Sequence, residues 1–206
     1  MLEARKLSAS RGDANLFTGL DFELKGGSLL RVGGANGSGK TSLLRALCGL
    51  LLPSAGEVRW NGENVRSLRE EYWKLLAYIG HADGLKDDLT VEENLAFACA
   101  LSGLQISAGR ARAALEKLGL AGRERLPARV LSQGQRRRTA LARLVVAESQ
   151  PLWVLDEPFA ALDAAAVEQV QSVASEHLAR GGIVVLTTHQ DARIEARSVV
   201  DLRLGR

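Results

Sequence analysis

The chain has 206 residues, of which 46% are hydrophobic and 25% charged, and its formal net charge is +3. This length allows one domain with a sizeable core, and the mild charge without a long lysine or arginine run argues against a nucleic-acid-binding protein. No run of about 18 apolar residues occurs, so we expect no membrane-spanning segment. Cys48 and Cys99 predict buried thiols in a reducing compartment.

Residues 1–33 predict short β-strands separated by glycine turns. The turn signals are Gly12-Asp13 and Gly26-Gly27, and the apolar or alternating runs cover residues 2–7, 17–24 and 28–32. The last of these runs is continuous and predicts a buried strand that leads into the segment that follows.

That segment fits the phosphate-binding pattern G-x-x-x-x-G-K-[ST] at every fixed position and is followed by a predicted helix. Its residues are Gly34, Ala35, Asn36, Gly37, Ser38, Gly39, Lys40 and Thr41, with Ser42 next. Backbone N–H groups of such a loop cradle phosphate, the lysine reaches the β- and γ-phosphates, and the hydroxyl can bind Mg²⁺. A glycine-rich turn before a core helix is the alternative. The strand–loop–helix context favours a phosphate site.

Residues 57–81 predict a hairpin, a short helix and a strand. Residues 57–60 alternate and Asn61-Gly62 is a hairpin signal. We expect a helix over residues 68–76 and a strand end at residues 77–80, directly before His81.

Residues 90–131 predict a helical insertion without strands. Thr90 and Glu93 form a predicted capping box, and a second helix covers residues 111–118. Five residues then open a third helix over 136–146, and they are Leu131, Ser132, Gln133, Gly134 and Gln135. On its own this opening could be an ordinary helix cap with Ser132 as the N-cap residue.

The last third of the sequence predicts two buried strands, at residues 151–155 and 183–187, joined by a helix over 167–180, and a final strand over 199–204. We expect His177, on that helix, to lie at the surface. Strands that alternate with helices indicate an α/β fold with a parallel sheet.

Polar residues follow the buried strands, at the edge where parallel sheets bind ligands. Asp156 is placed to hold Mg²⁺, Glu157 can act as general base toward a water, and His189 can contact the γ-phosphate or that water. Alternatively, the two acids cap the next helix and His189 is structural. The nearby phosphate loop favours the catalytic interpretation.

Together these motifs resemble the ATP-binding subunits of ABC transporters over essentially the whole chain. The resemblance implies a P-loop NTPase of the ABC ATPase type, with a mostly parallel core sheet, an N-terminal antiparallel β part and a helical subdomain. It places a RecA-like core at residues 1–84 and 136–206 and the helical subdomain at 85–135. It also implies ATP and Mg²⁺ as ligands, with Thr41 and Asp156 at the metal.

The resemblance further implies a head-to-tail homodimer in which residues 131–135 bind the γ-phosphate held by the other copy. Asp163 resembles the family's dimer loop, and His189 its switch histidine. ATP would then join the two copies, and hydrolysis would separate them.

Three positions depart from the family pattern. His81 stands where a γ-phosphate-sensing glutamine is usual, and Gln133 replaces a signature glycine. A base-stacking tyrosine is absent near residue 11, which leaves Arg11 or Phe17 as substitutes. For Arg11 a solvated loop charge, and for Phe17 core packing, is the favoured interpretation.

Within that family the chain is similar to the ATPase subunits of bacterial cytochrome c maturation, described as haem exporters. This resemblance implies integral membrane subunits as partners and a peripheral position on the cytoplasmic face of the inner membrane. ATP hydrolysis would drive haem export or release a haem-loaded chaperone. The ATPase subunit of another small exporter, or a soluble ABC-type ATPase of DNA repair or translation, is the alternative.

Overall fold

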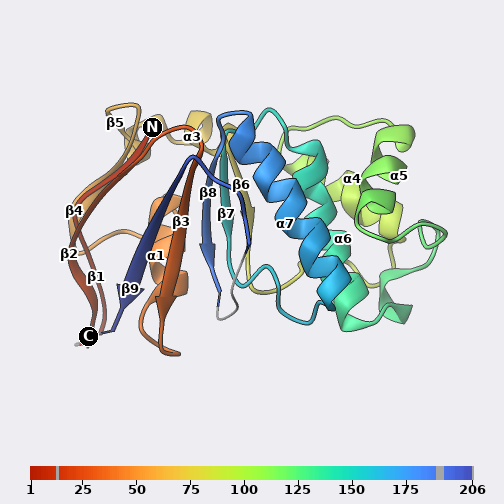
Figure 1. Cartoon of the computed structure of the whole chain (residues 1–206), viewed down its shortest axis with the longest axis horizontal. Coiled ribbons are helices and arrows are strands. Elements are labelled where there is room, and N and C mark those ends of the chain that lie inside the picture. Colours follow the sequence, from red (N-terminus) through yellow and green to blue (C-terminus); the bar gives the residue numbers. More distant parts are fainter. Residues whose placement is uncertain (13, 189–192, 206) are drawn as a thin grey trace.

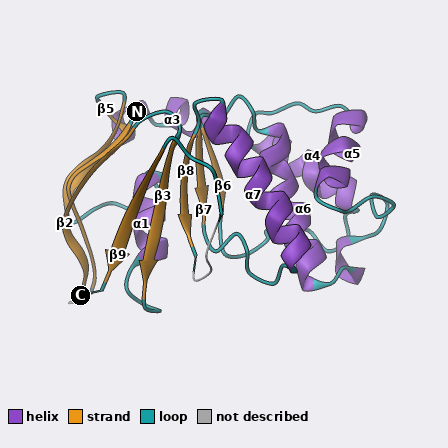
Figure 2. Ribbon diagram, viewed as in Figure 1, coloured by secondary structure: helices purple, strands orange, loops and turns teal. Residues whose placement is uncertain are grey.

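Two β-sheets and a set of helices make up the fold, which a computed structural model describes for residues 1–12, 14–188 and 193–205. The strands gather at one side of the molecule and most of the helices at the other (Figures 1 and 2). This arrangement confirms the predicted α/β class with separate antiparallel and helical parts.

The antiparallel sheet has the strand order β2-β1-β4-β5. Its strands are β1 (Leu2–Arg11), β2 (Ala14–Leu24), β4 (Ala55–Trp60) and β5 (Glu63–Asn64). The predicted turn at Asn61-Gly62 joins β4 to β5, and both residues have positive φ angles, of 50° and 86°. β1 and β2 run longer than the sequence predicted, because their register shifts at several points and so breaks the simple alternation.

The second sheet has five strands in the order β6-β7-β8-β3-β9, all paired in parallel. Its strands are β3 (Ser28–Gly34), β6 (Leu76–Ile79), β7 (Leu152–Leu155), β8 (Ile183–Thr187) and β9 (Ser198–Leu204). Along β7, Leu152 packs with the cluster around α1 (Lys40–Leu47), and Trp153 packs with the helices on the opposite face. Burial on both faces explains why this strand reads as an uninterrupted apolar run.

The four longer helices are α4 (Val91–Leu101), α5 (Ala108–Lys117), α6 (Gln133–Val146) and α7 (Ala164–Ala179), with the short 3₁₀ turn η1 (Ala128–Val130) before α6. Two of them lie against the other side of the parallel sheet, α6 beside β6 and α7 beside β8, and the other two, α4 and α5, pack on α6 farther from the sheet (Figure 1). The predicted capping box at Thr90 and Glu93 is confirmed at the start of α4. No helix within the described residues is both apolar enough and long enough to span a bilayer. The subdomain boundaries at residues 85 and 135 stay predictions.

The predicted helix over residues 68–76 is wrong in detail. Two short helices, α2 (Val65–Leu68) and α3 (Glu70–Lys74), meet at Arg69, whose φ of 49° interrupts the helical path. Tyr72 and Trp73 of α3 donate hydrogen bonds to the carbonyls of Leu47 and Cys48, at 2.6 and 3.2 Å. These bonds satisfy carbonyls at the end of α1, so tertiary contacts decide the local structure here.

His177 also differs from its predicted surface position. Its side chain lies on α7 with only 2% of the residue exposed, and its ring stacks on Trp153 with centroids 3.8 Å apart and planes 8° apart. Burial lowers the pKa of His177 from 6.5 to about 4. The folded protein therefore holds a neutral imidazole between the helix and the sheet.

Acid should destabilise the protein through this residue. Below pH 6.5 the unfolded chain binds a proton at His177 that the folded chain rejects until about pH 4. The free energy of unfolding should therefore fall by about 2–3 kcal/mol across that interval. Urea unfolding at pH 7 and pH 4.5 measures the change, and a His177→Phe variant should lose less stability on acidification. Equal losses in both proteins would contradict the assignment.

Candidate nucleotide site

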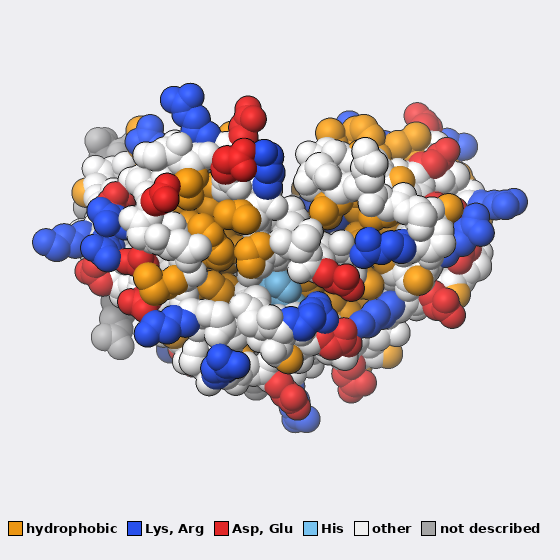
Figure 3. Space-filling model, turned by 90° about the horizontal axis from the view of Figure 1, so that it is seen from above, with side chains coloured by type: hydrophobic (Ala, Val, Ile, Leu, Met, Phe, Trp, Pro, Cys, Tyr) orange, Lys and Arg blue, Asp and Glu red, His pale blue; other side chains and the backbone are white. Residues whose placement is uncertain are grey.

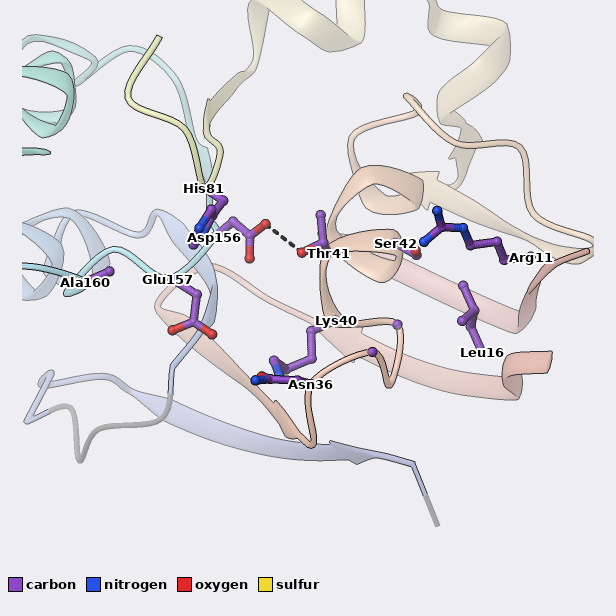
Figure 4. Close-up of a pocket in the computed structure, with 12 residues that line it drawn as sticks. Arg11, Leu16, Asn36, Lys40, Thr41, Ser42, His81, Asp156, Glu157 and Ala160 are labelled. Atoms are coloured by element: carbon purple, nitrogen blue, oxygen red, sulfur yellow. Dashed lines mark hydrogen bonds between the residues drawn. The ribbon is translucent and has the colours of Figure 1, made fainter. Parts of the chain in front are cut away.

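A cavity of about 560 Å³ opens where β3, β6 and β7 end. It is lined by Arg11, Leu16, Asn36, Gly37, Gly39, Lys40, Thr41, Ser42, His81, Asp156, Glu157 and Ala160. Figure 4 shows Glu157 and His81 at one end, Arg11 and Leu16 at the other, and Thr41 between them. The structure thus gathers the predicted loop, the acidic pair and His81 around one space.

The loop between β3 and α1 has a backbone that side chains would disturb. Gly34 and Gly39 have φ angles of 144° and 96°, in the region that favours glycine. A Cβ at Gly34 would lie 2.6 Å from the Leu204 carbonyl oxygen, and one at Gly39 would lie 2.9 Å from the Cβ of Leu16. These glycines allow the loop to turn tightly against its neighbours.

Lys40 is the first residue of α1, and its side chain extends back into this loop and is only 8% exposed. Its ammonium donates hydrogen bonds to the carbonyls of Gly34 and Ala35, at 2.8 and 3.2 Å. The buried hydroxyl of Ser38 has no hydrogen-bond partner within the described part of the chain. A cation and an unsatisfied hydroxyl in one loop fit a phosphate ligand.

A chain of hydrogen bonds joins the ends of β7 and β8 to the start of α1 beneath the cavity. The Thr41 and Thr187 hydroxyls each donate to one carboxylate oxygen of Asp156, both at 2.8 Å. The backbone N–H of Glu157 donates to the Thr187 hydroxyl at 2.8 Å. Asp156 is 2% exposed, so these bonds replace water around its carboxylate and hold it in place.

The donor set fits Mg²⁺. The Thr41 hydroxyl and the Asp156 carboxylate offer oxygen ligands that lie 2.8 Å apart. Mg²⁺ prefers a coordination shell with a few protein oxygens, completed by phosphate and water. His81 also lines the cavity but offers nitrogen, which suits Mg²⁺ poorly.

Glu157 is half-buried and has a φ of 50°, which is unusual for a residue with a side chain. This left-handed backbone directs its carboxylate into the cavity beside Ala160 (Figure 4). The third predicted residue, His189, lies outside the described residues.

The segment 131–135 forms the start of α6. Ser132 is the exposed N-cap residue, and its hydroxyl accepts from the Gln135 N–H at 3.3 Å, while the Gln135 side chain accepts from the Ser132 N–H at 3.0 Å. A Cβ on Gly134 would lie 2.7 Å from the Ala161 carbonyl oxygen, so glycine allows α6 to touch that loop. Leu131 is buried and Gln133 is exposed. None of these five residues is among those found to line the cavity of their own chain.

Asp163 is the N-cap residue of α7 and accepts a hydrogen bond from the Ala166 N–H at 2.8 Å. Its exposed position leaves the side chain at the surface, two residues beyond the Ala161 loop that touches Gly134. The start of α6 and the start of α7 therefore lie on neighbouring parts of the surface.

Arg11 lines the cavity and is itself exposed, so its interpretation as a solvated charge is not contradicted, and Phe17 is 7% exposed and packs in the core as expected. Sequence reasoning missed two other groups. Thr187 was not selected, although a hydroxyl at the end of an apolar strand is a usable signal. The second is Arg137, whose burial nothing in the sequence around it indicates.

Comparison with known proteins agrees with the motifs described above. A sequence profile described as ABC transporter matches residues 17–160. The cytochrome c biogenesis ATP-binding export protein CcmA of Nitrosomonas europaea is 56% identical over 205 residues, covering 100% of this chain and 96% of its own. The protein of the same name from Dechloromonas aromatica is 53% identical and is covered completely.

Solved structures share the fold. A putative ABC transporter ATP-binding protein from Pyrococcus furiosus has a TM-score of 0.84 and 26% identity, covering 98% of this chain and 96% of its own. A dimeric ATP-binding cassette bound to ADP and phosphate has a TM-score of 0.85 and 22% identity, covering 100% and 97%. The second likeness concerns the fold alone.

Proposed function

The chain belongs to the ABC transporter family as an ATP-hydrolysing subunit, and we propose that it drives a bacterial membrane complex of cytochrome c biogenesis. One observation supports the site assignment above the others. The loop lysine, the Thr41–Asp156 pair and Glu157 surround one cavity, while the exposed start of α6 stands apart from it.

Each residue of the cavity takes a separate role in this proposal. Residues 34–42 bind the triphosphate through backbone N–H groups and the Lys40 ammonium. Thr41 and Asp156 hold Mg²⁺, which neutralises charge on the phosphates when it is bound. Glu157 accepts the proton of the attacking water. His81 lies at the Glu157 end of the cavity (Figure 4), where this proposal puts the γ-phosphate.

The opposite end of the cavity receives the base. The phosphates lie on the loop with the γ-phosphate toward Glu157, so the base points toward Arg11 and Leu16 (Figure 4). A guanidinium group can stack on a purine, and the Leu16 side chain adds an apolar contact.

A second copy of the chain completes the site. Ser132, at an exposed position, and the half-buried Gly134 open α6, and a helix start offers free N–H groups to an anion. In a head-to-tail dimer this start binds the γ-phosphate held by the other copy, and Asp163 lies at the same interface. ATP then links the two copies, and its hydrolysis releases them.

The narrower pathway rests on the relatives. Proteins named as cytochrome c biogenesis export proteins are more than 50% identical to this chain along nearly their whole length. Within such a complex the chain acts at the cytoplasmic face of the inner membrane, and ATP hydrolysis drives haem export or releases a haem-loaded chaperone.

A second cavity supports contact with membrane subunits. It measures about 270 Å³ and is lined by Cys48, Leu50, Trp73, Leu76, Tyr78, Leu101, Ser102 and Arg143. Leu50, Trp73 and Leu101 are 55%, 51% and 74% exposed, which is unusual for large apolar side chains clustered at one place. The space-filling view shows a notch in the molecule, with exposed hydrophobic side chains on both sides of it (Figure 3). We place the membrane subunits over this cavity.

Purification from detergent-solubilised bacterial membranes tests the proposal. The tagged protein should recover integral membrane proteins of the cytochrome c biogenesis complex, and Leu101→Glu should reduce that recovery. Val199→Glu, at an exposed position on β9, serves as the control and should leave recovery unchanged. Recovery of ribosomes or DNA, or of membrane proteins with equal yield from both variants, would contradict the proposal.

A further inference from the structure

Arg137 is a buried cation that contacts backbone carbonyls in place of a carboxylate. It lies on α6, is 5% exposed, and forms no ion pair within the described residues. Burial lowers the pKa of this guanidinium, although the charges of Asp156, Asp83 and Glu157 oppose that change. A buried charge without an ion-pair partner is costly, so its contacts need a structural or functional reason.

The carbonyls come from two segments that end at the cavity. From the first segment, Gly80 and His81 accept from Nη1 at 2.8 and 3.5 Å. From the second, Asp156 and Glu157 accept from Nη2 at 2.7 and 2.9 Å, and Pro158 accepts from Nε at 3.4 Å. One planar group thus fixes the backbone on which both His81 and Glu157 are carried.

The second segment needs such support. Glu157 has a φ of 50°, which is costly for a residue with a side chain and persists only where its surroundings hold it. The Arg137 contacts to the carbonyls of residues 156–158 flank this point on both sides. They hold the backbone that directs the Glu157 carboxylate into the cavity.

The neighbouring Arg136 contacts the continuation of the first segment, in the loop that follows β6. Its guanidinium donates to Asp83 at 2.8 Å and to Asp87 at 2.7 Å, and also to the Ala128 carbonyl at 3.1 Å. Consecutive arginines therefore attach the loop after β6 to the first turns of α6. Arg137 lies five positions after Ser132, about 7–8 Å along the helix axis.

We infer that Arg137 is a positioning residue that couples the start of α6 to the backbone of Glu157 and His81. The inference rests on the proposed ATPase site. When the γ-phosphate held by the other copy binds at Ser132, it fixes the position of α6. Through its hydrogen bonds, Arg137 on α6 then fixes the backbone of the residues around the attacking water. Loss of Arg137 displaces Glu157 without removing any group that binds ATP.

Kinetics of Arg137→Lys test the inference. Lysine keeps the charge, but its single ammonium cannot reach five carbonyls spread along two segments. A displaced base should lower kcat by about 10- to 100-fold, and KM for ATP should stay within about 3-fold of wild type. Arg129→Lys is the matched control, because Arg129, on η1, forms an exposed ion pair with Asp88 and its replacement should change neither constant.

ATP affinity and the thermal midpoint of unfolding are measured for the same variants, so that a loss of turnover is separated from a loss of binding or of stability. A folded Arg137→Lys protein with wild-type kcat would overturn the inference, as would a raised KM with unchanged kcat. Should Arg137→Lys prove unfolded at 25 °C, Arg137→Gln is measured with it, and loss of fold in both would assign Arg137 to stability alone and overturn the inference. Failure of the ATPase assignment is distinguishable, because wild type and Arg129→Lys would then also lack activity.

Discussion

The Glu157→Gln variant should bind ATP normally and hydrolyse it about 100- to 10,000-fold more slowly than the wild-type protein. The side chain keeps its size, and the backbone bonds of residue 157 to Thr187 and Arg137 involve no carboxylate oxygen. The amide cannot accept the proton of the attacking water. The phosphate-binding loop is untouched, so affinity for ATP should stay within a few-fold of wild type.

Phosphate release and calorimetric ATP binding measure the two quantities separately. Glu168→Gln is the matched control, since Glu168 is an exposed acid on α7 away from the cavity, and its turnover should equal that of wild type. Wild-type turnover in Glu157→Gln would remove Glu157 from the role of base. A parallel loss of ATP affinity would place it in binding instead.

The Lys40→Ala variant should lose ATP binding itself. A charged hydrogen bond to phosphate contributes about 2–3 kcal/mol, so the dissociation constant should rise roughly 30- to 150-fold. Within the described residues the ammonium donates its hydrogen bonds to the Gly34 and Ala35 carbonyls, both from the segment directly before α1. The fold should therefore survive the substitution.

Calorimetric titration with ATP gives the affinity, and circular dichroism checks the fold. Lys74→Ala removes an exposed lysine whose contact is a surface pair with Glu71, and it should bind ATP as the wild type does. Unchanged affinity in Lys40→Ala would contradict the phosphate site at this loop.

The parts of the fold that the sequence predicted are those governed by local chemistry. The glycine positions of the phosphate loop, the capping box at Thr90 and the N-cap at Ser132 each depend on residues three to five positions apart. The apolar runs of β7 and β8 were equally clear, because strands buried on both faces are continuous in the sequence.

Contacts between distant segments could not be predicted. His177 was expected at the surface, because nothing in its helix indicates the Trp153 ring against which it packs. Thr187 and Arg137 reach Asp156 and Glu157 across 19 to 31 positions of sequence. Such pairs appear only when the sheet order is known, and the sheet order was not predicted.

The mass of the Glu157→Gln protein in solution at saturating ATP tests the central claim most directly. The account predicts a dimer at twice the 22.1 kDa chain mass, which separates when ATP is removed and fails to form when Ser132→Arg is added. Light scattering after gel filtration measures this. A single-chain mass at saturation, or a dimer indifferent to the Ser132 substitution, would contradict an ATP held between the phosphate loop of one copy and α6 of the other.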